Sequence, residues 1–349
     1  MGYAMKILSL LKLALISLLI IAAPLSYAVT IDKIIVFGDS LSDNGNLYNF
    51  TKKLNSITSY VPVLPKDPPY FKGRFSNGPV WIEYVAQVLN VPLVDYAYGG
   101  AWAENYSSSG QIVPFGLGTQ VDLFLTASVN DANTGNYLYV IWAGGNDYLH
   151  GNDEIDHATT NTIETIRSQI EWLTYYGAKN FLIVNMPDLG TTPEAAESGI
   201  AGIARARALS EMHNRKLVDM IAAEKTKYPD VKFISFDITK FYGEVIAHPE
   251  NYHIKNLTSA CYGGGYTVRA LAMNRNNAEL QAAQKAHINI ENNPSLMAAY
   301  STAKLAEAGQ MPCANPDDYF YWDHVHPSRV IHQAFSNAVV SALRENGVG

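Results

Sequence analysis

The chain has 349 residues, a formal net charge of −7 and enough apolar residues, 48% of the total, to bury a sizeable core. An excess of acidic groups argues against nucleic acid as a partner and provides no general attraction to anionic membranes. The length suits one α/β domain with insertions, which we prefer to two domains.

The first 28 residues are expected to be a signal peptide. Lys6 and Lys12 come before an apolar run over residues 13–23, and Ser26 and Ala28 are small residues at the two positions that a signal peptidase reads. The apolar run is short for a membrane span. Cleavage after Ala28 would leave residues 29–349 and take the formal charge from −7 to −9, because two lysines are removed. We therefore expect an exported protein, either secreted from the cell or periplasmic.

Short apolar or β-branched runs alternate with longer stretches of helical spacing through the remaining chain. The predicted strands are residues 34–37, 92–96, 137–142, 181–185 and 232–236. The predicted helices are residues 79–89, 158–176, 201–228 and 328–344, and Gly177 is expected to stop the second of these. This alternation is typical of a central parallel sheet with crossover helices, so the predicted fold class is α/β with about five strands.

Two regions interrupt this alternation. Residues 60–78 are rich in proline and are predicted to form an ordered surface loop. Residues 248–316 are predicted to be a partly helical insertion within the single domain. Cys261 and Cys313 are the two cysteines of the chain, and in an oxidising compartment they are expected to pair, with two unpaired buried thiols as the alternative.

A serine directly follows the first predicted strand, in the run Gly38-Asp-Ser-Leu41. A buried strand would deliver Ser40 into a tight turn at its carboxyl end, where α/β folds hold their chemistry. Ser40 can be a nucleophile only if a base and an oxyanion site converge on it. The alternative is a helix N-cap, for which Asp and Ser are favoured residues.

Candidates for the base and the oxyanion site lie far downstream. Asp323 and His326 stand three residues apart, so the carboxylate can hold the imidazole in the tautomer that a general base needs, and His324 would then point elsewhere. A solvated capping pair is the alternative. Two Gly-rich turns follow the second and third strands, where Gly100 could offer an N–H and Asn146 a side-chain amide to a developing oxyanion.

These four blocks, in this order, resemble the GDSL or SGNH hydrolases. The resemblance implies that Ser40 is the nucleophile, His326 the general base and Asp323 its orienting acid. It implies an oxyanion hole formed by Ser40, Gly100 and Asn146, and chemistry that needs no metal or cofactor. It also implies a three-layer α/β/α sandwich of flavodoxin-like type, because the Gly-x-Ser-x-Gly elbow of α/β-hydrolases is absent around Ser40.

A narrower likeness involves residues 42–46, 73–81 and 185–193, which resemble the branch of bacterial secreted phospholipases, thermolabile hemolysins and glycerophospholipid:cholesterol acyltransferases. That branch implies a lipid ester as substrate, with lysophospholipase A or phospholipase A activity. It also implies transient contact with a membrane surface and an alcohol or sterol as a second acyl acceptor. A general carboxylesterase of the same family is the alternative, since substrate choice varies on an unchanged core.

Two readings from other classes compete with the esterase. A metallophosphoesterase could use Asp39, Asn146, His324 and His326, but its usual pattern needs a histidine two residues after the aspartate, and position 41 is leucine. A non-catalytic surface-binding protein would be expected to have lost at least one polar catalytic position, and all are present.

Two further expectations concern access to Ser40. The disulfide-closed part of the insertion would end at Cys313, ten residues before Asp323, so we expect the insertion to gate lipid entry, with a surface excursion that does not contact the site as the alternative. Four aromatic residues next to the motifs could line an acyl pocket or simply pack in the core. They are Trp102, Trp142, Tyr148 and Trp322.

Overall fold

The computed structural model describes residues 29–57, 63–103, 116–151, 153–263, 281, 284–285 and 311–349. The expected signal peptide and most of the chain between the two cysteines lie outside the described residues. The first half of the fold contains β1 (Lys33–Gly38), α2 (Asn46–Ile57), α3 (Trp81–Leu89), β2 (Leu93–Asp95), α4 (Leu117–Ala127), β3 (Tyr137–Trp142), α5 (Gly145–His150) and α6 (Ile155–Tyr175). The second half contains β4 (Asn180–Val184), α7 (Pro193–Glu197), α8 (Gly199–Lys227), β5 (Lys232–Phe236), α9 (Ile238–Ala247), β6 (Asn256–Ala260), β7 (Tyr319–Tyr321) and α12 (Arg329–Glu345).

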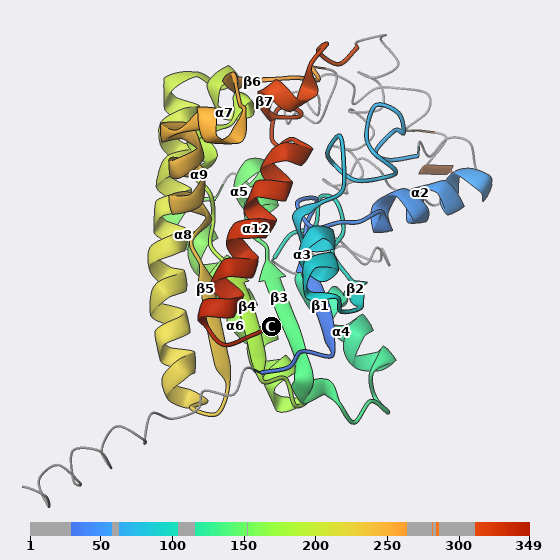
Figure 1. Cartoon of the computed structure of the whole chain (residues 1–349), viewed down its shortest axis with the longest axis vertical. Coiled ribbons are helices and arrows are strands. Elements are labelled where there is room, and N and C mark those ends of the chain that lie inside the picture. The colour runs from blue at the N-terminus through green and yellow to red at the C-terminus, as the bar shows by residue number, and fades with distance from the viewer. Residues whose placement is uncertain are drawn as a thin grey trace, which may run out of the picture.

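The central sheet consists of five parallel strands in the order β2-β1-β3-β4-β5 (Figure 1). This is the flavodoxin-like order, and it confirms the predicted fold class and all five predicted strands. The chain reverses its direction of winding between β1 and β3, so the loops that follow these two strands separate and leave a crevice at their carboxyl ends. Ser40 and Asn146 follow β1 and β3 respectively.

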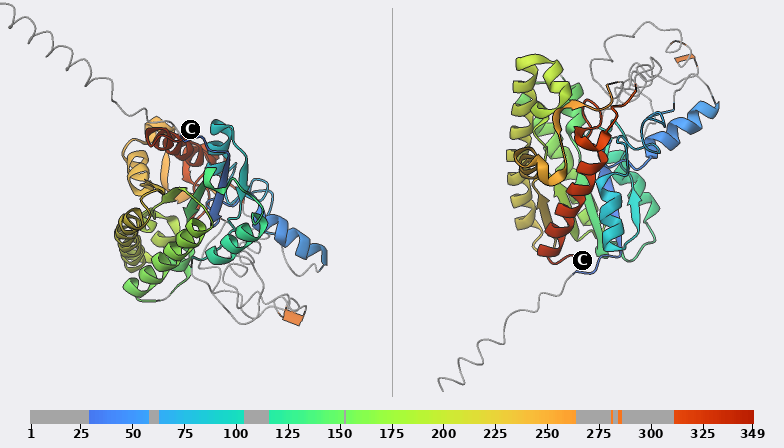
Figure 2. Two further views of the ribbon diagram at one scale, coloured as in Figure 1. Left: turned by 90° about the horizontal axis from the view of Figure 1, so that it is seen from below. Right: turned by 45° about the horizontal axis from the view of Figure 1, so that its top comes forward.

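Alternation along the strands produces two apolar faces. In β3, Leu138, Val140 and Trp142 belong to the core under α3, α9 and α12, whereas Tyr139 and Ile141 belong to the core under α4, α6 and α8. Strands buried on both faces are expected for a parallel sheet covered by helices. The two helical layers lie on opposite sides of the sheet (Figure 2), which confirms the three-layer sandwich.

The four predicted helices correspond to α3, α6, α8 and α12, with ends that differ by at most three residues. Gly177 ends α6 as predicted, with a φ of 99° that favours glycine. The sequence patterns did not reveal α2, α4 and α9. Helix α2 buries only Leu47 and Thr51 among its twelve residues, so it carries almost no apolar stripe. Residues 63–78 contain no helix or strand, in agreement with the predicted loop.

A small second sheet pairs β6 with β7, and the Cys261–Cys313 disulfide lies beside it, with Cα atoms 5.0 Å apart. The predicted pairing of the two cysteines is therefore confirmed. Tyr252 and Ile254 pack against the main core, so the beginning of the expected insertion belongs to the packed domain. The expected gating and the helical content of residues 264–310 concern residues outside the described part, apart from Gln281 and residues 284–285.

The first described residue lies beside the carboxyl terminus. Val29 donates its N–H to the carbonyl oxygen of Gly347 at 2.7 Å and forms a bridge with Val348. This contact lies at the amino-terminal edge of the sheet, opposite the loops that carry Ser40 and Asn146 (Figure 1). Among the described residues, no helix is long and apolar enough to cross a membrane.

Candidate active site

Ser40 lies in a tight turn held at both ends. Before the turn, the Gln120 side chain accepts the Gly38 N–H at 2.9 Å and donates to the Gly38 carbonyl at 2.8 Å. A Cβ on Gly38 would lie 2.3 Å from the Trp142 carbonyl oxygen, so only glycine fits there. Within the turn, the Asp39 carboxylate accepts the Leu41 N–H at 3.0 Å. These contacts leave Ser40 7% exposed at the carboxyl end of β1.

Asp43 connects this turn to the next one. Its carboxylate accepts N–H groups from Gly45 at 2.7 Å, Asn46 at 2.6 Å and Leu47 at 3.2 Å, which caps the start of α2. It also accepts the Gly99 N–H at 2.7 Å, from the turn that contains Gly100. Burial raises the pKa of Asp43 to about 6 in spite of these four donors. Part of the segment that prompted the narrower resemblance therefore has a structural role.

Ser40, His326 and Asp323 form one hydrogen-bonded chain. The Ser40 hydroxyl donates to His326 Nε2 at 2.7 Å, and His326 Nδ1 donates to the two Asp323 carboxylate oxygens at 2.9 and 2.8 Å. Asp323 is fully buried and also accepts the backbone N–H groups of Val325 and His326 at 2.9 and 2.7 Å. Burial opposes the charge of Asp323, but the charge of His326 and these hydrogen bonds hold its pKa below the ordinary value.

His324 turns away from this chain, as expected. Its Nδ1 lies 2.9 Å from the Glu197 carboxylate, and its Nε2 lies 3.3 Å from the Gly263 carbonyl oxygen. Glu194, Glu197 and His324 are the one group of metal-ligating side chains in the described part of the chain with atoms within 4.8 Å of one another. The histidine of the metallophosphoesterase alternative is thus directed away from Asp39 and His326.

The two oxyanion candidates lie on neighbouring turns. Asn146, in the first turn of α5, lines the same pocket as Ser40, and its side-chain nitrogen donates to the Ala101 carbonyl oxygen at 2.8 Å. An amide nitrogen carries a second hydrogen, so this contact leaves one donor to the pocket side. Gly100 lies in the Tyr98–Ala101 turn with a φ of 76°, a conformation that favours glycine. The structure therefore places Asn146 in the pocket that Ser40 lines, and it links the turn that contains Gly100 to Asn146 through Ala101 and to Asp43 through Gly99.

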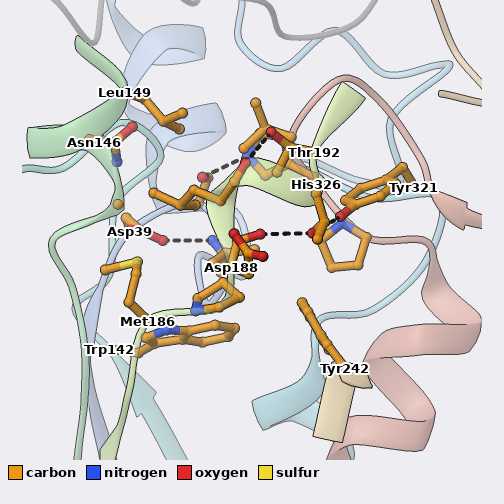
Figure 3. Close-up of a pocket in the computed structure, with 18 residues that line it drawn as sticks. Asp39, Trp142, Asn146, Leu149, Met186, Asp188, Thr192, Tyr242, Tyr321 and His326 are labelled. Atoms are coloured by element: carbon orange, nitrogen blue, oxygen red, sulfur yellow. Dashed lines mark hydrogen bonds between the residues drawn. The ribbon is translucent and has the colours of Figure 1, made fainter. Parts of the chain in front are cut away.

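An apolar pocket opens beside Ser40 and His326 (Figure 3). Asn146 and Leu149 lie on one side of it, Tyr321 and Tyr242 on the other, with Met186 and Trp142 below. The described residues that line it are Asp39, Ser40, Leu41, Trp142, Gly145, Asn146, Leu149, Met186, Pro187, Asp188, Leu189, Thr191, Thr192, Tyr242, Tyr321, Val325, His326 and Pro327.

Of the four aromatic residues considered for an acyl pocket, Trp142 lines it. Tyr148 instead donates or accepts a hydrogen bond with His213 Nδ1 at 2.7 Å, and Trp322 stacks on Tyr262 with ring centroids 5.7 Å apart. Trp102 is not among the lining residues that the structure describes. The packing alternative therefore fits Tyr148 and Trp322.

Several residues of the site have no sequence signal. Gln120 and Tyr70 act through hydrogen bonds to residues far away in the sequence, and Met186 and Tyr242 contribute ordinary apolar surface. A local signal could have found Asp43, because an aspartate shortly before a helix is a common cap. That signal was missed because α2 itself was not recognised.

Residues 34–339 match the family model of the GDSL-like lipases/acylhydrolases, and the chain therefore belongs to that family of esterases and lipases. It is 29% identical over 316 residues to a phosphatidylcholine-sterol acyltransferase of Aeromonas hydrophila, covering 89% of this chain and 90% of that protein. It is 26% identical over 310 residues to a thermolabile hemolysin of Vibrio parahaemolyticus, covering 87% of this chain and 62% of that protein. Among solved structures, it resembles the native aryl esterase of M. smegmatis with a TM-score of 0.38 and 17% identity, over 60% of this chain and 85% of that one. Family membership and the acyltransferase and hemolysin relatives agree with the resemblance stated from the sequence.

Proposed function

We propose that the protein is an exported serine acyl-ester hydrolase that acts on lipids, with lysophospholipase A or phospholipase A activity and acyl transfer to an alcohol or sterol as a second outcome. The observation that carries the proposal is the Ser40–His326–Asp323 chain, with its 2.7 Å contact between nucleophile and base, at the rim of an apolar pocket. The acyltransferase and hemolysin relatives support the lipid substrate.

The proposed reaction has two steps. Ser40 Oγ attacks the ester carbonyl carbon while His326 Nε2 takes the hydroxyl proton, and His326 then gives that proton to the departing alcohol oxygen. Water, or a sterol hydroxyl, repeats the attack on the acyl-enzyme and returns Ser40 to its free form. Asp323 holds the imidazole through Nδ1 and stabilises its positive charge.

Negative charge develops on the carbonyl oxygen during each attack. Ser40 N–H, Gly100 N–H and the free Asn146 amide hydrogen are the proposed donors to that oxygen. The turns that carry them are fixed to one another through Asp43 and Ala101, so little reorganisation is needed as the charge develops. Removing one such donor typically costs on the order of 100-fold or more in kcat.

The pocket supports an acyl chain as the group that is transferred. Leu149, Met186, Leu189 and Val325 provide aliphatic contacts, and Trp142 provides a large flat one. Among the lining residues that the structure describes, Asp39 and Asp188 are the charged ones besides the titratable His326. An acyl chain gains about 0.8 kcal/mol for each methylene that it buries.

The test uses Ser40→Ala in the mature protein, with hydrolysis of a short-chain nitrophenyl ester and of mixed phospholipids, lysophospholipids and cholesterol as readouts. We expect the esterase rate to fall by roughly three orders of magnitude or more, because the nucleophile is lost and the fold is unchanged. Ser168→Ala, an exposed serine on α6, is the matched control and should retain the wild-type rate.

Mass spectrometry of the lipid products then separates the substrate hypotheses. Release of fatty acid from phospholipids or lysophospholipids, with or without cholesteryl ester, supports the lipid assignment. Turnover of short esters alone supports the general carboxylesterase. A Ser40→Ala protein with near wild-type activity would refute the proposed mechanism.

A further inference from the structure

Asp323 receives a hydrogen bond from a residue 253 positions earlier in the chain. The Tyr70 hydroxyl donates to Asp323 Oδ2 at 2.6 Å, and both side chains are buried, with Tyr70 1% exposed. Tyr70 belongs to the proline-rich loop, whose described residues 63–78 contain no helix or strand and none of the motifs that carry Ser40, Gly100, Asn146 or His326. The loop thus reaches the innermost member of the Ser40–His326–Asp323 chain.

The ring of Tyr70 is fixed by three aromatic neighbours. Phe75, Tyr262 and Trp322 contact it edge to face, with ring centroids 5.8, 5.8 and 6.1 Å away. These contacts pack the ring in the orientation in which its hydroxyl meets the carboxylate. Phe75 also packs against the His326 ring at 5.0 Å. The loop therefore supports the imidazole and its carboxylate together.

We propose that Tyr70 is a positioning residue for acyl transfer: its hydroxyl fixes the Asp323 carboxylate in the plane that His326 requires and withdraws part of its negative charge, which sets the basicity of His326. This inference rests on the proposed function, because it assigns His326 as the general base. A carboxylate that shares its charge with a second donor stabilises an imidazolium less than one that does not.

Other groups also act on His326 and Asp323, and they stay unchanged in the test. Asp39 and His332 interact electrostatically with His326, and Tyr262 with Asp323. His332 is neutral at physiological pH because burial lowers its pKa to about 3. Tyr262 stays protonated because burial raises its pKa to about 12. Burial raises the pKa of Asp39 to about 6, so Asp39 also contributes to the pH profile. Because this contribution is present in both proteins, the profile of the variant is compared with that of the wild-type protein.

The variant that tests the proposal is Tyr70→Phe, which keeps the ring and its packing and removes the hydroxyl. We expect kcat on a short-chain ester to fall about tenfold with KM nearly unchanged, because one hydrogen bond to a charged group is lost. We also expect the acidic limb of the kcat/KM pH profile to move to higher pH, because the less neutralised carboxylate stabilises the His326 imidazolium more strongly.

Tyr139→Phe is the matched control. Tyr139 is equally buried, and its hydroxyl donates to the Thr134 carbonyl oxygen at 2.9 Å, at the opposite edge of the sheet. This variant should keep the wild-type pH profile and kcat. NMR titration of the His326 ring protons, in a Ser40→Ala background with and without Tyr70→Phe, measures the protonation of His326 directly, without turnover.

The outcomes separate this inference from the proposed function. If Ser40→Ala abolishes activity and Tyr70→Phe leaves both kcat and the acidic limb unchanged, the role of Tyr70 is overturned and the hydrolase assignment stands. A lower kcat with an unmoved acidic limb also overturns it, because a simple packing defect would produce that result. If Ser40→Ala remains active, the proposed function itself fails.

Discussion

Asp39 sits between the end of β1 and Ser40, and it is a buried carboxyl with few donors. Its carboxylate accepts the Leu41 N–H, whereas Asp43 four residues later receives four N–H groups. Burial raises the pKa of Asp39 to about 6, against the lowering effects of the Leu41 hydrogen bond and of His326. Asp39, the residue before Ser40, therefore carries a charge that the folded state disfavours.

The raised pKa of Asp39 predicts that the free energy of unfolding depends on pH. Between pH 4 and 6 the folded Asp39 holds a proton that the unfolded one releases, so the free energy of unfolding falls as pH rises through this window. A pKa raised from 3.8 to about 6 corresponds to a loss of about 3 kcal/mol. Asp39→Asn keeps an oxygen for the Leu41 N–H and lacks the charge. Its free energy of unfolding should therefore fall by about 3 kcal/mol less than that of the wild type between pH 4 and 6.

Urea unfolding at pH 4, 5, 6 and 7 measures the difference between the two proteins. Asp43→Asn is the contrasting variant: an amide nitrogen would face N–H donors, so it should lower stability at every pH. Equal slopes for wild type and Asp39→Asn between pH 4 and 6 would contradict a raised pKa at Asp39.

The sequence could predict Ser40, Asp323, His326 and Asn146 as candidates because their motifs are short and local, and their roles in the reaction stay predictions. It could not reveal Tyr70 or Gln120, since each acts through a hydrogen bond that only the folded chain brings into range. The oxyanion role of Gly100 stays a prediction.

At the scale of elements, helix α4 holds the end of β1. Gln120 is fully buried and uses both ends of its amide on Gly38, although the Gly38 carbonyl also accepts the Tyr98 N–H at 3.2 Å. The Gly38 N–H has the Gln120 oxygen as its partner. Helix α4 thus fixes the position of the end of β1, and with it the turn that carries Ser40.

Gln120→Met fills the same volume without an acceptor. We expect it to lower the free energy of unfolding by about 1–3 kcal/mol, because a buried N–H loses its partner, and to lower kcat by shifting the turn that carries Ser40. Gln87→Met, at an exposed position on α3, is the control and should change neither quantity appreciably. Denaturant unfolding and ester hydrolysis on both variants provide the comparison, and a Gln120→Met protein as stable and active as wild type would count against the role of α4.

The elements that sequence patterns predicted are the ones with strong apolar periodicity. Helices α6 and α12 present eight and seven buried residues to the core, and both were predicted within three residues of their ends. Helix α2 begins where the Asp43 side chain caps it and buries two residues. Its position depends on Asp43 and on contacts with the rest of the chain, which periodicity does not encode.

For the whole molecule, the proposed export predicts a defined starting residue. Cleavage after Ala28 would make Val29 the first residue, and Val29 is also the first residue that the structure describes, where it contacts Gly347 and Val348. We expect the intact mass of the exported protein to correspond to residues 29–349. A mass that includes Met1 would rule out the cleavage, and the Ser40→Ala protein should show the same processing as wild type because export precedes catalysis.

The bridge between Val29 and Val348 has an engineering consequence. Both ends of the domain leave the molecule at the edge of the sheet opposite Ser40, so a fluorescent tag or a solid support attached after Gly349 would leave the pocket facing solution. The same closeness would allow the two ends to be joined by a short linker and the chain to be reopened between α4 and β3, at the exposed residues Val129 and Asn130. Such a circular permutant would keep every contact described around Ser40, while His326 would be synthesised before Ser40 instead of after it.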